Sequence, residues 1–362
     1  MKKNTYTLLT YYVFVDIPNL EEEIKEHKKF CTQIGMKGRI YMGPEGISAT
    51  LTGNDWQIMA YKLYMKNKPR LDGVEFLDLK ATKVDDYYFE KMICKYRDEI
   101  VKLDHIVTPQ EVETYKQEMS IGDFKQIMEN WDPKKYAILD MRNSYEYKLW
   151  HFRHAEPSGT VNFREMGRLL KDYTARFGDR KVIMYCTWGI RCEKLAVLLH
   201  KHWLNNFYSL QSGIVWYVNH YDDGNWLGNL YTFDGRVSTY VWSQKTHTTI
   251  GNCIYTGELT DNIENCRYWP CNARIICKPK AYRKHLWFCS QECYNKAKKD
   301  LRIKDDNFDK NDYQKIRDEI KRYSDKKESY LMKIGNFLDS RLSSLDWKHK
   351  TSQKEEYIDC EC

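Results

Sequence analysis

Short apolar runs alternate with amphipathic stretches along the amino-terminal part of the chain. Residues 6–15 are rich in β-forming side chains and predict a strand, while residues 20–34 predict a helix that ends at Gly35. Two further β-rich runs flank Gly43-Pro44-Glu45-Gly46, which is typical of the turn of a β-hairpin. The chain is therefore predicted to begin with the order strand, helix, strand, strand.

A second helix at about residues 54–66 and a strand at about residues 74–79 complete the order β-α-β-β-α-β. This is the order of a ferredoxin-like α+β domain, which we expect over residues 1–98. The charged residues 99–119, which include a proline, predict a linker to the next domain.

Continuous apolar runs replace the alternating pattern in the central part of the chain. Residues 137–141 and 182–185 have the form of strands that are buried on both faces of a sheet. Helical patterns lie between and after them, most clearly at residues 193–203. We therefore expect an α/β domain with a parallel sheet over residues 120–225.

The remaining sequence predicts two further segments. Residues 226–300 begin as a β-rich connector and continue as a basic, cysteine-rich segment, and residues 301–362 predict a charged helical tail. No apolar run reaches the roughly 20 residues that would span a bilayer. The start of the chain lacks the features of a signal peptide, so we expect a cytoplasmic protein without a membrane partner.

Positive charge is concentrated in the cysteine-rich segment. The chain has a formal net charge of +7. Residues 274–304 alone contain ten lysines and arginines against two acidic residues, an excess of +8, so the rest of the chain is close to neutral. Such a patch favours a phosphate-bearing partner. The alternative is a solvated surface without a ligand.

One cysteine lies where a buried strand is predicted to end. A helix is predicted to begin near Cys192, and the loop before it consists of Cys186, Thr187, Trp188, Gly189, Ile190 and Arg191. Loop N–H groups and the helix dipole stabilise a thiolate, which makes Cys186 a candidate nucleophile at neutral pH. The same donors would hold a persulfide on that sulfur.

Two other interpretations of Cys186 stay open. A buried strand cysteine is often only a small apolar residue. Cysteine phosphatases place five residues between the cysteine and an arginine, and here the interval from Cys186 to Arg191 is one residue shorter. The smaller ring suits a sulfur atom better than a tetrahedral phosphate.

The segments LDMRNSYEY (139–147), NFRE (162–165) and YCTWGIRCEK (185–194) resemble the rhodanese domain of one family, and KGRIYMGPEGISATLTG (37–53) resembles part of its amino-terminal, acylphosphatase-like domain. The family is the rhodanese-containing tRNA uridine(34) hydroxylases. The resemblance covers roughly residues 5–295. It implies oxygen-dependent 5-hydroxylation of the wobble uridine of tRNA, with Cys186 as the nucleophile or persulfide carrier.

The resemblance also implies roles for charged residues near the loop. Asp140 and Arg142 match the D-x-R pair of rhodaneses and are expected to form an ion pair that braces the loop. Arg191 is expected either to neutralise charge near the sulfur or to turn outward and pair with Glu146 or Glu193.

The loop departs from the family pattern at one position. Where the family has Gly-Gly after Cys-Thr, this sequence has Trp188-Gly189. Because only glycine adopts a positive φ without cost, Trp188 either takes an ordinary backbone conformation or shifts the loop. Its ring either fills the loop or offers a stacking face for a base.

Two pairs of cysteines in the basic segment have the spacing of a metal site, with His285 as an alternative ligand. The pairs are Cys266-x4-Cys271 and Cys289-x3-Cys293. Four thiolates on two turns can close a tetrahedral structural zinc site. The alternative is a set of reduced cysteines without a metal.

The same segment contains candidate tRNA contacts among its basic residues. These are Arg274, Lys278, Lys280, Arg283 and Lys284. They are interleaved with the aromatic residues Tyr268, Trp269, Tyr282, Trp287 and Phe288. Such aromatics either stack on bases or form the core of a small metal domain.

Three functions are compatible with this sequence. The first is hydroxylation of the wobble uridine, the second is transfer of persulfide sulfur to a small acceptor, and the third is an RNA-binding scaffold with a relic rhodanese domain. No haem, flavin or non-haem iron motif is visible, so no cofactor for the chemistry is evident beyond dioxygen as co-substrate. The sequence predicts neither an oligomeric state nor a set of substrate tRNAs.

Overall fold

The structure is a computed structural model. It describes residues 6–68, 71, 74, 77–80, 89–221, 224–228, 230–231, 238–239, 248–268, 270–271 and 273–300, with backbone alone at 77–80, 230–231, 238–239 and 300. The tail predicted at 301–362 and Trp269 lie outside the described residues. The chain forms two compact units, Met1–Ser290 and Gln291–Cys362, and each is described by itself.

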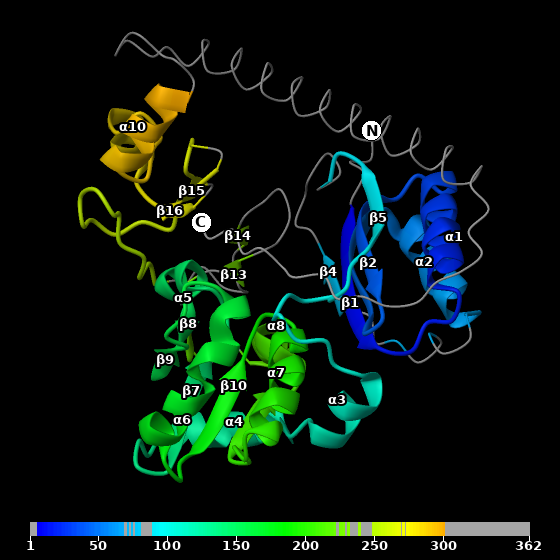
Figure 1. The fold of residues 1–362 in the computed structure, drawn as a ribbon, viewed down its shortest axis with the longest axis horizontal. Coiled ribbons are helices and arrows are strands. Elements are labelled where there is room, and N and C mark those ends of the chain that lie inside the picture. Colours follow the sequence, from blue (N-terminus) through cyan, green and yellow to red (C-terminus); the bar gives the residue numbers. More distant parts are fainter. Residues whose placement is uncertain are drawn as a thin grey trace, which may run out of the picture. The chain divides into compact units, whose positions relative to one another are not determined.

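The amino-terminal domain has the predicted ferredoxin-like topology. Strands β4, β1, β3 and β2 form an antiparallel sheet in that order, and an additional strand, β5, pairs with β2 in parallel. Figure 1 shows helices α1 and α2 on the same face of this sheet. The bounds are β1 Thr7–Phe14, α1 Leu20–Gln33, β2 Lys37–Gly43, β3 Gly46–Gly53, α2 Asp55–Lys66, β4 Leu77–Lys80 and β5 Met92–Tyr96.

Alternation along three strands gives this sheet one apolar face and one polar face. Residues such as Leu9, Ile40 and Leu51 are buried in the core beneath the helices. The side chains between such core residues point to the opposite face, because successive residues of a strand alternate. We call these residues the polar sheet face: Thr10, Tyr12, Arg39, Tyr41, Ser48 and Thr50.

The segment expected to be a linker contains a helix, α3 (Pro109–Tyr115). A capping box between Thr108 and Glu111 begins the helix, and its proline occupies a position where the missing N–H costs nothing. Leu103, Val107 and Val112 are buried in the same core as the central sheet. The segment predicted as a linker thus contains a helix and buried residues that pack in the core of the next domain.

The central domain has the predicted parallel sheet, with strand order β6-β11-β10-β7-β9. Helices cover both faces of this sheet. The strands are β6 Glu118–Met119, β7 Tyr136–Asp140, β9 Ala155–Pro157, β10 Lys181–Tyr185 and β11 Phe207–Leu210. The helices are α4 Ile121–Glu129, α5 Ser144–Leu149, η1 Phe163–Leu169, α6 Leu170–Phe177, α7 Ile190–Lys201 and α8 Gly213–His220.

Strand β10 lies in the middle of this sheet and contributes to both cores. Val182, Met184 and the following Cys186 lie in the core that includes residues of α6 and α7. Ile183 and Tyr185 lie in the core that includes residues of α4 and α8. The continuous apolar run therefore reflects burial on both faces, and it brings Cys186 to the end of the central strand.

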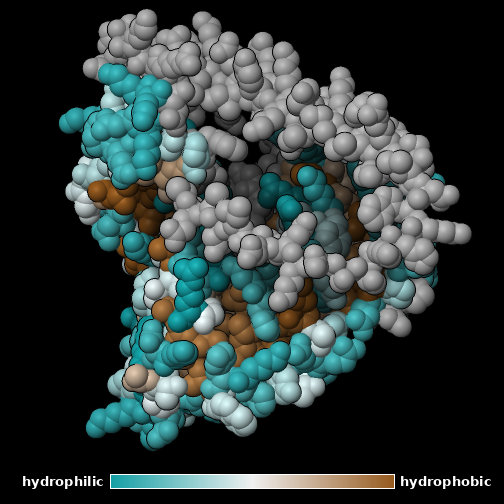
Figure 2. All heavy atoms as spheres, viewed as in Figure 1, coloured by the Kyte–Doolittle hydropathy of each residue, from teal (hydrophilic) through white to brown (hydrophobic). Residues whose placement is uncertain are grey.

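Short elements lie within the central domain, in the case of β8, and after it. They are β8 His151–Phe152 paired with β12 Trp226–Leu227, β13 Leu230–Tyr231 paired with β14 Ser238–Thr239, β15 Ile263–Asn265 paired with β16 Arg274–Ile276, and helix α9 Pro279–Lys284. Of the second unit the structure describes helix α10 (Gln291–Asp300), whose visible surface in Figure 2 is hydrophilic. In the described part of the chain, no helix combines the length and apolar character needed to cross a membrane.

Candidate active site

The loop after β10 holds the sulfur of Cys186 in a fully buried position. The strand ends at Tyr185 and α7 begins at Ile190, so the structure has the strand–loop–helix arrangement that the sequence indicated. The N–H of Gly189 donates a hydrogen bond to the Cys186 sulfur at 3.1 Å. Cys186 has an exposed fraction of 0%, so the loop and its surroundings supply every contact of the thiol.

The surroundings of Cys186 favour its thiolate form. Burial raises the pKa of the Cys186 thiol, but a hydrogen bond from Cys192, the charge of Arg191 and N–H groups of the loop together outweigh burial. The net result is a pKa lowered from 9.0 to about 5. Cys186 is therefore a thiolate at neutral pH, the form in which cysteine is a nucleophile.

Arg191 combines the two roles between which the sequence left a choice. Its guanidinium makes a bidentate ion pair with Glu146, at 3.0 and 3.2 Å, and donates to the Thr187 hydroxyl at 3.3 Å. The side chain is buried, so it does not turn outward. Its positive charge still lowers the pKa of Cys186. Glu193, the other candidate partner, accepts a hydrogen bond from Tyr12.

Trp188 takes an ordinary backbone conformation, and Gly189 alone in this loop has a positive φ, of 102°. A Cβ atom on Gly189 would lie 2.5 Å from the Tyr12 hydroxyl, so glycine is required there for both conformation and space. The Trp188 ring is half-buried against the core and also lines a neighbouring cleft. It thus fills the loop and keeps a face toward the cleft.

The amino terminus of α8 forms hydrogen bonds with the backbone of the Cys186 loop. The N–H groups of Ile214 and Val215 donate to the carbonyl oxygens of Cys186 and Thr187, at 3.0 and 3.2 Å. Gly213 lies so close that a Cβ atom would be 2.5 Å from the Cys186 carbonyl oxygen. Two helices therefore fix the loop, α7 in sequence and α8 through space.

Asp140 and Arg142 form an ion pair at the end of β7, with Nη2 to Oδ2 at 2.6 Å and both side chains fully buried. Arg142 also donates to the carbonyl oxygen of Trp150. The Tyr185 hydroxyl donates to Asp140 at 2.7 Å, which ties β7 to the residue before Cys186. The pair thus has the geometry of a brace for the loop, and neither side chain lines the cleft.

A cleft of about 510 Å³ lies between the Cys186 loop and the polar sheet face. Its lining includes Cys186, Thr187, Trp188 and Ile190 from the loop, and all six residues of the polar sheet face. This volume is in the range of sites that take one small ligand. This face was not predicted from the sequence, although the period-two pattern of the hairpin strands could have indicated it.

A buried ion-pair network joins the amino-terminal domain to the helix that follows the loop. Lys194 of α7 has an exposed fraction of 0%, and its Nζ lies 2.7 Å from Glu45 and 2.6 Å from Glu99. Glu45 comes from the β2–β3 turn and also accepts the N–H groups of Ile100 and Val107, each at 3.0 Å. The hairpin turn was predicted, but the partner of its glutamate was not.

Tyr12 makes a second connection between the same parts of the protein. Its hydroxyl belongs to the polar sheet face and donates to the Glu193 carboxylate beside the loop. Burial raises the pKa of Glu193 to about 7, although the hydrogen bond from Tyr12 acts in the opposite direction. The amino-terminal sheet therefore contacts the first turn of α7 directly.

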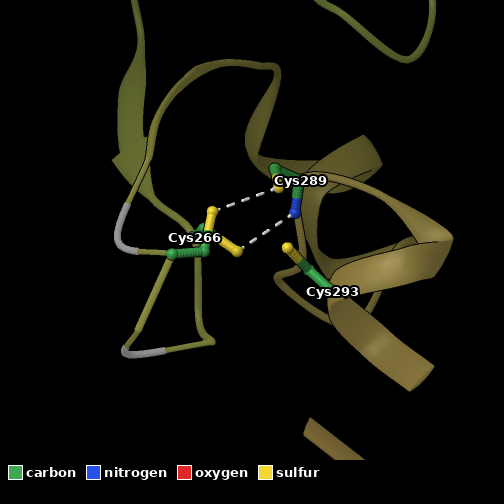
Figure 3. A group of neighbouring side chains, drawn as sticks. Cys266, Cys289 and Cys293 are labelled. Atoms are coloured by element: carbon green, nitrogen blue, oxygen red, sulfur yellow. Dashed lines mark hydrogen bonds between the residues drawn. The ribbon is translucent and has the colours of Figure 1, made fainter. Parts of the chain in front are cut away.

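The predicted thiolate cluster comes together near the end of the described chain. The sulfur atoms of Cys266, Cys271, Cys289 and Cys293 all lie within 4.8 Å of one another. Figure 3 shows Cys266, Cys289 and Cys293 pointing toward one another. His285 does not belong to this group, and its ring stacks on Tyr255 with centroids 4.1 Å apart.

Spacing between the sulfurs fits one tetrahedral ion. Zinc–sulfur bonds of about 2.3 Å place the sulfurs of a tetrahedral site about 3.8 Å apart. The sulfurs of Cys271 and Cys289 are 3.8 Å apart. The N–H of Cys289 donates to the sulfur of Cys266 at 3.4 Å, although burial still raises the pKa of Cys266 above its usual value in the absence of a metal.

The candidate RNA contacts lie beside this cluster. Arg274, Lys280, Arg283 and Lys284 are exposed, whereas Lys278 is half-buried and pairs with Glu258 at 3.1 Å. Among the aromatic residues, Tyr282 and Phe288 are buried and Trp287 is half-buried. The buried rings form part of the small core, so the basic side chains present the surface suited to phosphate.

Three family matches cover most of the described chain. Residues 6–100 match the UPF0176 acylphosphatase-like domain, residues 120–220 match the rhodanese-like domain, and residues 227–294 match the Rhodanase C-terminal family. The first two matches agree with the ferredoxin-like and parallel-sheet folds that the sequence predicted.

Curated relatives match the chain over the same region. The tRNA uridine(34) hydroxylase of Bacillus licheniformis is 36% identical over 295 residues, which cover 80% of this chain and 89% of the relative. The tRNA uridine(34) hydroxylase of Bacillus mycoides is 35% identical over 292 residues, with coverages of 80% and 89%. That of Onion yellows phytoplasma is 32% identical over 292 residues, with coverages of 80% and 92%.

Proposed function

This chain belongs to the family of tRNA uridine(34) hydroxylases, and from this premise we propose that it hydroxylates C5 of the wobble uridine of tRNA. The observation that carries the proposal is the Cys186 thiolate at a cleft whose walls come from two domains. A small-molecule sulfurtransferase needs only the loop. A cleft completed by the amino-terminal sheet favours a larger substrate.

The lining of the cleft suits a nucleotide. The polar sheet face supplies hydroxyl groups and two tyrosine rings, and Arg39 and Arg164 line the cleft with positive charge. Hydroxyls and amides can read the edge of a uracil base, whereas arginines favour its phosphates. We propose that the wobble nucleotide is extruded into this cleft, because a base that undergoes chemistry must leave its stack.

Within the cleft we assign Cys186 as the nucleophile or persulfide carrier, and dioxygen as the source of the hydroxyl oxygen. Arg191 and the Gly189 N–H stabilise the negative charge of the sulfur. The ion pair of Asp140 and Arg142 braces the loop. We place the reaction in the cytoplasm. Growth under ¹⁸O₂ provides the test of the oxygen source, with one labelled oxygen expected in the modified nucleoside.

We further propose that the four clustered thiolates hold a structural zinc ion, which would supply no step of the chemistry. Their sulfur spacing fits a tetrahedral zinc site. The exposed basic residues Arg274, Lys280, Arg283 and Lys284 would then present a rigid surface to the phosphates of tRNA. None of these four basic residues lines the cleft.

Nucleoside analysis of tRNA from a strain that lacks this gene and any parallel pathway tests the proposed function. The strain is complemented with wild type, with Cys186→Ser, or with Cys94→Ser, a buried cysteine of the amino-terminal domain, as the matched control. We expect 5-hydroxyuridine-derived nucleosides with wild type and Cys94→Ser and none with Cys186→Ser. Undiminished product with Cys186→Ser would overturn the proposal and favour a scaffold role.

A further inference from the structure

A second thiol lies next to the Cys186 sulfur. Cys192 follows in the first turn of α7, where its N–H donates to the Gly189 carbonyl oxygen at 2.9 Å. The turn of the loop brings its side chain back to Cys186, to which it makes a hydrogen bond. Both side chains have an exposed fraction of 0%, so the two sulfurs are enclosed together.

The two thiols differ in charge. The environment lowers the pKa of Cys186, whereas burial and the neighbouring Cys186 sulfur raise the pKa of Cys192 well above its usual value. At neutral pH the pair is thus one thiolate and one thiol, and the thiol donates to the thiolate. This is the arrangement of a dithiol in which one sulfur attacks and the other resolves the product.

The two residues also differ in their position relative to the cleft. Cys186 is among the residues that line the cleft, whereas Cys192 is not. Because both side chains are buried, a small oxidant such as a hydroperoxide is the class of reagent that suits this site.

We propose that Cys186 and Cys192 form a two-cysteine redox site that reacts with hydrogen peroxide and closes to a reversible disulfide. The Cys186 thiolate attacks the O–O bond, which forms an S–O bond and releases hydroxide. The Cys192 thiol then attacks the oxidised sulfur, which forms the S–S bond and releases water. Overall, two thiols and one hydrogen peroxide become one disulfide and two waters, and a dithiol reductant restores the thiols.

This reaction goes beyond the proposed hydroxylation and does not rest on it. Its consequence is protection of Cys186, since a sulfenate that meets no thiol is oxidised further to irreversible acids. The disulfide would also withdraw the nucleophile from the cleft until it is reduced.

Mass spectrometry of the reduced full-length protein after exposure to hydrogen peroxide tests the proposal. In wild type we expect the loss of two hydrogens, with peptide mapping that joins Cys186 to Cys192 and full recovery on reduction by dithiothreitol. In Cys192→Ser we expect Cys186 to gain two or three oxygens that dithiothreitol does not remove. Cys94→Ser, which removes a distant buried cysteine, should behave as wild type.

Two outcomes would overturn the proposal. One is accumulation of sulfinic acid on Cys186 in wild type as fast as in Cys192→Ser, and the other is a peroxide-induced disulfide that excludes Cys192. Cys192→Ala provides a second variant if the serine disturbs folding. Because the measurement involves no tRNA, a failure here leaves the hydroxylation proposal standing, and a failure of hydroxylation leaves this one standing.

Discussion

At the scale of single residues, the low pKa of Cys186 depends in part on the positive charge of Arg191, which forms an ion pair with Glu146. Arg191 pairs with Glu146 through both of its terminal nitrogens, which fixes the guanidinium beside the loop. A buried, paired arginine cannot swing toward the sulfur or away from it. Its field therefore acts on Cys186 constantly, and the loop N–H groups add to it.

Replacing the Arg191–Glu146 pair by Met and Gln should raise the pKa of Cys186 from about 5, by roughly one to three pH units for the loss of a nearby opposite charge. The double replacement avoids leaving a buried carboxylate without its partner. The rate of iodoacetamide alkylation at Cys186, measured against pH, reports the change as a midpoint displaced to higher pH. Arg191→Lys keeps the charge and should displace the midpoint less, and an unmoved midpoint in the double variant would refute the assignment.

Residues of the loop were predictable because their spacing follows the chain. Cys186 and Arg191 lie within one strand–loop–helix segment, so their proximity needs no knowledge of the fold. Tyr12 and Glu193 are 181 residues apart, and only the packing of two domains brings them together. For the same reason the sequence left the partner of Arg191 open.

At the scale of elements, a buried ion pair connects the β2–β3 hairpin to helix α7. Lys194 is held by Glu45 from the hairpin turn and by Glu99 from the segment after β5. The helix that begins at the Cys186 loop is therefore anchored to the sheet that forms the other wall of the cleft. The position of the loop relative to that wall depends on this network.

Lys194→Met should destabilise the protein by roughly 3–5 kcal/mol, because the buried Glu45 carboxylate loses Lys194 as its ion-pair partner and Glu99 keeps Lys102 alone of its two lysine partners. Burial raises the pKa of Glu99, but hydrogen bonds from Lys194, Lys102 and the Leu103 N–H outweigh it and lower the pKa from 4.5 to about 2. Its contribution to stability is therefore present above about pH 4.5 and is lost as the pH falls toward 2. Urea unfolding measured from pH 7 to pH 3 should show a smaller acid-induced loss of stability in Lys194→Met than in wild type. Equal losses in both proteins would contradict this account.

The thiolate cluster should behave as one metal site. Purified wild type should contain one zinc per chain, and Cys266→Ser should lose it, since three thiolates hold zinc more weakly than four. Cys277→Ser is the matched control, because Cys277 is buried in the same segment but lies outside the group. Metal analysis by atomic emission decides the matter. Equal zinc in Cys266→Ser and Cys277→Ser would exclude the site.

The pattern of apolar residues predicted strands and helices well where one face or all faces of the element are buried. The strands at 137–141 and 182–185 appear as β7 and β10, because continuous apolar runs reflect burial on both faces. Helix α3 was missed because its sequence is charged and Val112 is its single buried residue, so no apolar period is visible. Its capping box at Thr108 and Glu111 was the available signal.

At the scale of the whole molecule, the cleft is a property of neither domain alone. The amino-terminal sheet contributes the polar sheet face, the central domain contributes the thiolate loop, and Tyr12 and Lys194 join the two. The sequence predicted both folds and indicated Cys186 as a candidate nucleophile. It could not predict the cleft, because side-chain alternation says which residues share a face but not what that face packs against.

The central claim is that the wobble uridine enters this cleft, and photocrosslinking tests it most directly. A tRNA anticodon stem-loop with 4-thiouridine at position 34 is irradiated with the full-length Cys186→Ser protein, and the crosslinked peptides are identified by mass spectrometry. A stem-loop with 4-thiouridine in the stem is the control. The account predicts crosslinks at position 34 to β1–β3 and the loop after β10, with the stem probe reacting elsewhere. Crosslinks from position 34 confined to residues outside the cleft would contradict it.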